Sequence, residues 1–562
     1  MEKIKSTDVK NYEINSDKTN LILKYALKNA TEYNGKANFQ AVLGKIIQEK
    51  PELKNNIKEL AKEINEIIKK VNSLNLDEQK SQLEKYSFEE KQKKQHVLPE
   101  LPNVKGKVVT RIAPYPSGPL HIGNARTFII NDEYAKMYHG KLLLVIDDTI
   151  GSEEKQIFKE AYKLIPEGLK WLKFKFDKKI IYRSNRLKLY YKYAEELTKL
   201  DKAYVCFCSA EKLRNNRVNG VECIHRNSSV EENLENWKKM FKMKEGEAVL
   251  RIKTNMQDPN PAFRDRVIFR ISNREHPRTK KKYRIWPLLD FSAAIDDYSL
   301  GITHIIRGKE LMIEGEMERY IWGIFNWPQK EIIHSGLLQI LGIKLSKSKS
   351  RKEVLSGKYI GWDDPRTFSL QSLKRRGFKP EAIRKFCLSF GLTQTEITVP
   401  VETLYTENKK LIDKTSKRYF VIFNPKKIKI ENAPKLKVKA PLHPDYNYGF
   451  RTFDTGNEFY IQDKLERNKN YRFMHLFNFK NNKFISQELD KNLDAKLIHW
   501  LPVSKDLVDV EVLMDNGEII KGLGEKDLKK VKVNEVIQAE RNFFMRLDKK
   551  EKNKLTFWFS HK

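Results

Sequence analysis

The strongest structural constraint in the sequence is the stretch RIAPYPSGPLHIGNAR at residues 111–126. A run rich in β-branched residues, 107–112, leads into a loop that contains three prolines and a glycine. An amphipathic helix is then expected from about Leu120 to Tyr138. A strand, a tight loop and a helix N-terminus in this order form the first unit of a nucleotide-binding α/β sheet. Because the first N–H groups of such a helix are unpaired, we expect phosphate to bind there.

Two residues in the first turn of this helix suit a nucleotide. His121 can donate to a phosphate oxygen, and Gly123 lets a purine or ribose lie against the backbone. An ordinary Pro/Gly loop between two structural elements is the alternative interpretation. A second stretch, LSKSKS at 345–350, favours the nucleotide, because a lysine in a polar loop can neutralise charge on a transferring phosphate.

The two stretches together resemble the HIGH and KMSKS signatures of class I aminoacyl-tRNA synthetases. GWDDPR at 361–366, LKRRGFKPEAI at 373–383, and AIDD with GITHIIRG between 294 and 308 resemble the glutamyl/glutaminyl subgroup. The nearest resemblance is to the archaeal-type glutamyl-tRNA synthetases, and it covers nearly the whole chain. It implies an enzyme that activates glutamate with ATP and transfers it to the 3′ end of tRNA(Glu), with tRNA(Gln) as an optional second substrate.

The resemblance also implies a multidomain fold around an α/β core of the Rossmann type. The expected domains are a helical N-terminal extension at 1–103, the first half of the core at 104–204, an insertion that binds the tRNA acceptor end at 205–284, the second half of the core at 285–330, a helical stem-contact segment with the LSKSKS loop at 331–398, and an all-β barrel that binds the anticodon at 399–562. Alternating runs such as 508–514, followed by Asp-Asn-Gly at 515–517, indicate a hairpin in the last domain. We expect further strands at 531–537 and 555–559.

Charged residues mark the ends of two expected core strands. Asp147 directly follows the apolar strand expected at 142–146, where its carboxylate can bind an ammonium group or cap a helix. A second apolar run, 291–295, precedes a strand expected at 301–308. Arg307, near the end of that strand, can form a two-pronged pair with a carboxylate.

The resemblance assigns roles to these and other residues. Catalysis is expected from His121 and Lys347, with Mg²⁺ sharing the phosphate charge. ATP is expected to contact Pro114, Gly118, His121, Gly123, Asn124, Ser346, Lys347 and Ser348. Glutamate is expected to contact Arg111, Asp147 and Arg307.

Several positions around the expected pocket depart from the subgroup's pattern. They are Tyr115, Val145, Ile150, Leu289 and Leu311. These departures keep two other interpretations open, a glutaminyl-tRNA synthetase and a tRNA-binding paralog with impaired catalysis. Arg307 favours glutamate over glutamine, because a guanidinium buried against a neutral amide leaves its charge unpaired.

A cluster of metal-ligating residue types lies in the insertion. It consists of Cys206, Cys208, Cys223 and His225, and so contains three of the four cysteines of the chain. Paired S/S and S/N ligands on two tight turns suit a tetrahedral zinc ion of structural role, because four protein ligands leave no open coordination position. Cysteine is also a common buried residue, and plain core packing is the alternative. Cys387, alone in an apolar helical run, is expected to be core.

The net charge of +34 indicates a polyanionic partner, although biased codon usage or adaptation to heat also enriches lysine. Basic residues with interspersed aromatics are dense at 255–284, as in surfaces that bind phosphates and splayed bases. The expected tRNA contacts are Arg264, Arg266, Lys280, Lys281, Lys282, Arg375 and Arg376.

The remaining features concern setting and assembly. No apolar run approaches the ~20 residues of a membrane span, and the first residues lack the apolar core of a signal peptide. With only four cysteines, a reducing cytoplasm and no disulfide framework are expected. A monomer is also expected. In the N-terminal extension, apolar residues recur at helical spacing over 53–71, and an exposed helix is expected over 77–96. This extension is expected either to dock tRNA or a protein, or to be a structural appendage.

Overall fold

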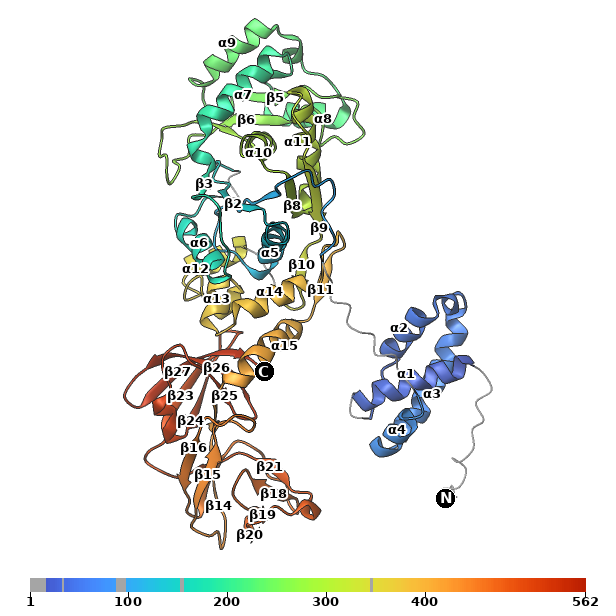
Figure 1. The fold of residues 1–562 in the computed structure, drawn as a ribbon, viewed down its shortest axis with the longest axis vertical. Coiled ribbons are helices and arrows are strands. Elements are labelled where there is room, and N and C mark those ends of the chain that lie inside the picture. The colour runs from blue at the N-terminus through green and yellow to red at the C-terminus, as the bar shows by residue number, and fades with distance from the viewer. Residues whose placement is uncertain (1–16, 33–34, 87–97, 152–155, 344–346) are drawn as a thin grey trace. The chain divides into compact units, whose positions relative to one another are not determined.

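The computed structural model describes residues 17–32, 35–86, 98–151, 156–343 and 347–562, and the chain divides into two compact units, 1–95 and 96–562 (Figure 1). The first unit is helical, as predicted. Its helices are α1 (Asp17–Glu32), α2 (Phe39–Glu49), α3 (Ile57–Ser73) and α4 (Leu76–Leu83), with a 3-10 turn at Pro51–Asn56. The second unit begins before the predicted boundary at 103, because Leu98 and Leu101 pack against Val108 and Tyr134.

Helix α3 carries the apolar face that the sequence periodicity predicted. Its buried side chains form a core with α1 and α2, and they are Leu60, Ile64, Ile68 and Val71. The helix expected over 77–96 is shorter than predicted: α4 starts with a capping box at Asn75 and ends at Leu83. Residues 87–97 lie outside the described part of the chain.

The first half of the core is a β–α–β unit, as residues 107–146 predicted. Strand β1 (Val109–Ile112) pairs in parallel with β2 (Lys141–Ile146), and α5 (Ile122–Met137) connects them. Strand β2 also pairs in parallel with β3 (Ile181–Tyr182), and β8 (His304–Gly308) pairs in parallel with β9 (Glu331–Ser335). The Thr303 amide donates to the Val109 carbonyl at 3.0 Å, which joins the two sets of strands.

The apolar run at 291–295 lies on a helix, α10 (Leu289–Ser299). Every residue from 290 to 297 is buried, so the helix has no exposed face there. Helix α10 packs against α7 (Leu187–Lys199) and α11 (Met312–Ile324).

The insertion between the two halves of the core is built on a four-stranded antiparallel sheet. In spatial order its strands are β4 (Ala203–Cys206), β5 (Val249–Ile252), β6 (Val267–Ile271) and β7 (Ile285–Pro287). Two helices, α8 (Ala210–Asn219) and α9 (Val230–Met240), lie between β4 and β5 in the chain. The sheet therefore extends slightly beyond the predicted limits of 205 and 284 at both ends.

The segment after the core is mainly helical, as predicted. It contains β10 (Leu338–Ile340), α12 (Lys347–Leu355), α13 (Leu370–Arg375), α14 (Pro380–Leu388), β11 (Ile397–Val399) and α15 (Val401–Ile412), and the earlier α6 (Ala161–Trp171) packs against α13. Cys387 is buried in this core, which confirms its structural role. The β-rich part was predicted to start at 399, but α15 displaces its start to Arg418.

The described residues from 418 onward are β-rich. Seven strands form one sheet in the order β12-β25-β26-β27-β23-β24-β13. All strands of this part, including those of smaller sheets, are in chain order β12 (Arg418–Tyr419), β13 (Val421–Phe423), β14 (Lys426–Lys429), β15 (Lys437–Pro441), β16 (Phe450–Asp454), β17 (Glu458–Ile461), β18 (Asn470–Phe473), β19 (Asn478–Lys480), β20 (Lys483–Ser486), β21 (Lys496–Ile498), β22 (Leu501–Pro502), β23 (Val508–Leu513), β24 (Ile519–Gly524), β25 (Val536–Ala539), β26 (Phe543–Lys550) and β27 (Lys554–His561). The hairpin predicted at 515–517 joins β23 and β24, whereas the strand predicted at 531–537 starts later than expected and is β25, at 536–539.

Candidate functional site

The predicted phosphate loop runs from the end of β1 to the N-terminus of α5. The Asp147 amide donates to the Pro114 carbonyl at 3.1 Å, so the loop is held against the end of β2. His121 is the N-cap residue of α5 and forms a β-bridge with Ser369. A Cβ atom on Gly118 would lie 3.0 Å from the Trp362 ring, so the loop packs closely on the GWDDPR segment. Two motifs that are far apart in the sequence therefore meet here.

The LSKSKS motif lies only partly within the described chain. Ser346 lies outside it, and for Lys347 and Ser348 the structure describes the backbone, as the first turn of α12, without the side chains. Further along α12, the Arg351 guanidinium lies 5.7 Å from the Phe158 ring centroid. The Phe158 amide donates to the Pro116 carbonyl at 2.8 Å, so these contacts link α12 to the phosphate loop.

Asp147 follows β2, as predicted, and Asp148 beside it is buried too, but the two carboxylates make different contacts. Asp147 forms an ion pair with Arg183 at 2.9 Å. Asp148 accepts from the backbone amide and the hydroxyl of Ser184 at 2.8 and 2.7 Å, and from the Tyr162 hydroxyl at 3.0 Å. Asp148 therefore anchors the segment after β3, whereas Asp147 is the carboxylate that the resemblance assigns to the amino acid.

Arg183 contacts the candidate site through Asp147, and the sequence analysis missed it. It is fully buried and bridges two carboxylates, with Asp147 at 2.9 Å and Asp296 of α10 at 3.1 Å. Burial raises the pKa of Asp296, although its arginine partners oppose that shift. A single arginine beside a short strand gives little signal in sequence, and only the acidic pair in AIDD pointed to this cluster.

The two arginines expected to bind glutamate each have a carboxylate partner within the chain. Arg111 forms a two-pronged pair with Asp297 at 2.8 and 2.7 Å. Arg307 forms another with Glu318 at 2.8 and 2.7 Å. Both guanidiniums are buried, and burial raises the pKa of Glu318. Both two-pronged pairs are formed with internal carboxylates, and the contact of these arginines with glutamate stays a prediction.

The predicted tRNA contacts divide into internal and exposed residues. Arg376 was wrongly predicted: it is fully buried and donates to the Phe559 and Ser560 carbonyls at 3.1 and 2.7 Å, so it has no surface for tRNA. Three others have partners within the chain: Arg264 donates to the carbonyls of Asp258, Arg217 and Val218, Arg266 pairs with Asp290 and Glu314, and Arg375 pairs with Asp548 and Asp363. The side chains of 280–282 are exposed.

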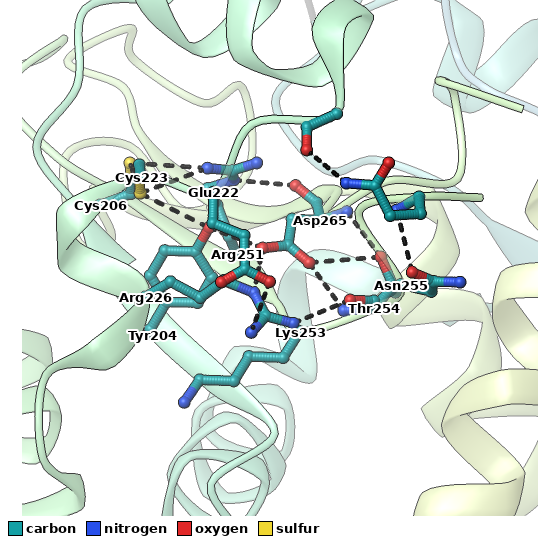
Figure 2. A network of polar contacts seen from close by, with 12 residues as sticks. Tyr204, Cys206, Glu222, Cys223, Arg226, Arg251, Lys253, Thr254, Asn255 and Asp265 are labelled. Atoms are coloured by element: carbon teal, nitrogen blue, oxygen red, sulfur yellow. Dashed lines mark hydrogen bonds and ion pairs between the residues drawn. The ribbon is translucent and has the colours of Figure 1, made fainter. Parts of the chain in front are cut away.

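The four metal-ligating residues predicted from the sequence come together at the end of β4. Figure 2 shows two of them, Cys206 and Cys223. The ligand atoms of Cys206, Cys208, Cys223 and His225 all lie within 4.8 Å of one another. The Cys206 and Cys223 sulfurs are 3.7 Å apart, and the Cys208 sulfur lies 3.6 Å from the His225 Nδ1 atom. A tetrahedral zinc ion with Zn–S bonds of about 2.3 Å and Zn–N bonds of about 2.05 Å requires separations of about 3.8 and about 3.6 Å. The two printed separations therefore match those of a tetrahedral zinc site.

Comparison with known proteins identifies the family. The family model described as tRNA synthetases class I (E and Q), catalytic domain, matches residues 107–414, and the anti-codon binding domain of the same family matches residues 416–498. The chain belongs to this family. The synthetase is therefore an enzyme that joins an amino acid to tRNA, and the class predicted from its two signature motifs is confirmed. The junction between the matched domains lies between α15 and β12.

The synthetase is similar over nearly its full length to proteins named glutamate–tRNA ligase. The ligase of Methanocaldococcus jannaschii is 44% identical over 555 residues, which cover 96% of this chain and 99% of the relative. The ligase of Pyrococcus abyssi is 45% identical over 572 residues, with the same coverage. Within the described part of the synthetase, no helix is both long and apolar enough to cross a membrane.

Proposed function

We propose that this synthetase is a glutamate–tRNA ligase that charges tRNA(Glu) in the cytoplasm. The observation that carries the proposal is the full-length similarity to relatives of that name, which extends through both matched domains. In the first step a glutamate carboxylate attacks the α-phosphate of ATP, and pyrophosphate leaves. In the second step the 2′-hydroxyl of the terminal adenosine attacks the acyl carbon, and AMP leaves. Neither step requires a protein nucleophile, so catalysis consists of positioning and charge stabilisation.

The phosphate loop and α12 supply the groups for the first step. We assign His121 and Lys347 to the phosphates of ATP. His121 is the N-cap residue of α5, and Lys347 is the first residue of α12. The contact between Arg351 and Phe158 links α12 to the phosphate loop. Further contacts with ATP are proposed for four residues of the phosphate loop and α5, namely Pro114, Gly118, Gly123 and Asn124. The LSKSKS motif would add Ser346 and Ser348. Mg²⁺, held mainly by phosphate oxygens, would supply further charge neutralisation.

For the amino acid we keep Arg111, Asp147 and Arg307. Their internal partners preorganise each charged group, and an arginine fork has five N–H donors, more than one carboxylate can accept. In particular, the Nε atom of Arg307 has no hydrogen-bond partner among the described residues. A substrate carboxylate can therefore share a guanidinium with the internal carboxylate.

We further propose that Cys206, Cys208, Cys223 and His225 hold a structural zinc ion, which the sulfur–sulfur and sulfur–nitrogen separations support. The exposed lysines at 280–282 are proposed to contact tRNA, and the strands from 418 onward to form the barrel that reads the anticodon. We keep tRNA(Gln) as a second substrate, a monomeric state, and a docking role for the N-terminal unit as parts of the proposal.

Pyrophosphate exchange tests the first step. With tRNA present, we expect exchange that depends on glutamate, and we expect Lys347→Ala to slow it by ~100-fold, because the lysine would stabilise developing phosphate charge. Exchange that depends on glutamine instead would support the glutaminyl enzyme, and no exchange with either would support the tRNA-binding paralog. An unchanged rate in Lys347→Ala would remove that residue from catalysis.

A further inference from the structure

A buried arginine lies beside the cysteine cluster. Arg251 is on β5 directly opposite Tyr204 on β4, and its side chain has no exposed surface (Figure 2). Its guanidinium carbon lies 5.3 Å from the Tyr204 ring centroid. The side chain points along the sheet toward Cys206 and Cys223.

The polar partners of Arg251 are unusual for a buried cation. Its Nε atom donates to the Asp265 carbonyl at 2.8 Å, and Nη1 contacts the sulfurs of Cys206 and Cys223 at 3.9 and 3.7 Å. Its Nη2 atom has no hydrogen-bond partner in the described chain. A nearby carboxylate, that of Asp265, is occupied by other groups: it accepts from the Tyr204 hydroxyl at 2.8 Å, from Arg226 at 3.0 Å and from the Thr254 amide at 2.7 Å. Arg251 thus has no ion pair with a carboxylate within the described residues.

The charge of this cation requires a counter-ion, because an unpaired charge in a protein interior is strongly destabilising. A zinc ion bound by three thiolates and one neutral imidazole has a net charge of −1, and two of those thiolates would be the sulfurs that Arg251 already contacts. The site and the arginine together would then be neutral.

We propose that Arg251 is the outer-sphere counter-ion of the metal site and positions Cys206 and Cys223 for zinc. The proposal rests on the zinc site proposed above. Asp265 fixes the arrangement, because its carbonyl holds Arg251 and its carboxylate holds both Tyr204 and the chain after β5. Outer-sphere partners of this kind orient ligands and typically change metal affinity by about 10- to 100-fold.

The test uses the purified full-length protein with Arg251→Met, Arg251→Lys and the control Lys253→Met. The control removes a positive charge two residues away, where Lys253 pairs with Asp201 at 2.6 Å. Zinc content is measured first, then zinc affinity by competition with a chromophoric chelator. The midpoint of thermal unfolding is measured with and without zinc.

We expect wild type to hold one zinc ion and Arg251→Met to bind it about 10- to 100-fold more weakly. The difference in unfolding midpoint between the zinc-loaded and zinc-free forms should shrink in this variant, because the stabilisation by a ligand follows its affinity. Arg251→Lys, which keeps the charge, should recover part of the affinity, and Lys253→Met should bind as wild type does.

The possible failures are distinct. Wild type without zinc would overturn both the metal site and this inference. If wild type holds zinc and Arg251→Met binds it with equal affinity, the inference alone is overturned. This holds even if the unfolding midpoints of the zinc-loaded and zinc-free variant both fall by the same amount, because loss of packing would have that effect. Should Arg251→Met not fold, Arg251→Lys decides: weakened zinc binding in a folded protein supports the inference, and unchanged affinity contradicts it.

Discussion

At the level of single residues, the candidate site is organised by buried ion pairs. Arg111 with Asp297 and Arg307 with Glu318 are both two-pronged, and Arg183 bridges Asp147 and Asp296. Pairs of this kind add little net stability over apolar packing, but removing one partner leaves an uncompensated charge in the interior. Their contribution is therefore preorganisation, since each guanidinium is held in one orientation before a substrate arrives.

Asp297→Asn tests this description. The substitution leaves the buried Arg111 without a counter-ion, so we expect the free energy of unfolding to fall by about 3–5 kcal/mol, measured by urea denaturation. The control is Glu167→Gln, which breaks an exposed pair with Lys163 at 3.8 Å and should change stability by less than about 1 kcal/mol. Equal, small effects in both variants would contradict the account.

A pH dependence is expected from His499 in the C-terminal part. The ring is buried, with Nε2 at 3.1 Å from the Val421 carbonyl and Nδ1 at 3.0 Å from the Arg541 guanidinium. A carbonyl only accepts and a guanidinium only donates, so the neutral ring with its hydrogen on Nε2 is favoured. Burial, followed by the charge of Arg541, lowers the pKa of His499 from 6.5 to about 4.

Between these two values the unfolded chain takes up a proton that the folded chain resists, so stability falls as the pH drops from 6.5 toward 4. The loss from this histidine approaches about 3 kcal/mol. His499→Gln should lose correspondingly less stability between about pH 7 and about pH 4.5 in urea unfolding, because it has no group to protonate. An identical loss in wild type and variant would rule out this residue as the source.

Local signals predicted the candidate residues that lie in recognisable short patterns, but not the pairs whose partners are distant in the sequence. The position of Asp147 after an apolar strand and the close spacing of the metal-ligand residues were both readable from the sequence. The partner of Arg111 is 186 positions away, and no local pattern predicts such a pair. Arg375 and Arg376 are identical residues at adjacent positions, so the sequence does not tell which one is buried. In the structure Arg376 is fully buried, whereas Arg375 is only partly buried.

At the level of helices and strands, the first β–α–β unit depends on one close approach. Gly140 ends the turn after α5, and a Cβ atom there would lie 2.2 Å from the Val108 carbonyl oxygen. The adjacent Lys141 amide donates to that same carbonyl at 2.8 Å. Any side chain at 140 must therefore displace β1 relative to β2, and β1 leads into the phosphate loop.

Gly140→Ala should lower the free energy of unfolding by about 1–3 kcal/mol through this overlap. Gly323→Ala is the matched control, since Gly323 lies in α11 and an added Cβ would meet nothing within 4 Å. That substitution should be neutral or stabilise the chain by up to about 1 kcal/mol, because alanine is the better helix former. Urea unfolding of both variants would reveal the opposite signs, and a tolerated Gly140→Ala would contradict the packing described.

Elements with a regular period were predicted well, and elements buried on all sides were not. The periodic face of α3 and the hairpin of β23 and β24 are both present. The run at 291–295 is buried on every side and carries no clear period, so the sequence did not distinguish the helix α10 from a strand. Helix α15 was not predicted, because the β-rich domain was expected to begin at residue 399.

For the chain as a whole, distant motifs meet at the phosphate loop. The loop after β1 contacts the GWDDPR segment, and α12 contacts the residues beside the same loop. In turn, Arg375 and Arg376 of the helical segment contact the C-terminal sheet through Asp548 and the carbonyls of β27. This continuity gives a physical route between the part that would activate the amino acid and the part that would read tRNA.

The central claim, that this assembly charges tRNA with glutamate, is tested most directly by aminoacylation. Purified protein would be mixed with ATP, Mg²⁺, tRNA and either labelled glutamate or labelled glutamine. We predict label on tRNA(Glu) with glutamate and none above background with glutamine, because the relatives that match nearly the full chain are named glutamate–tRNA ligases. Charging with glutamine, or no charging with either amino acid, would contradict the account.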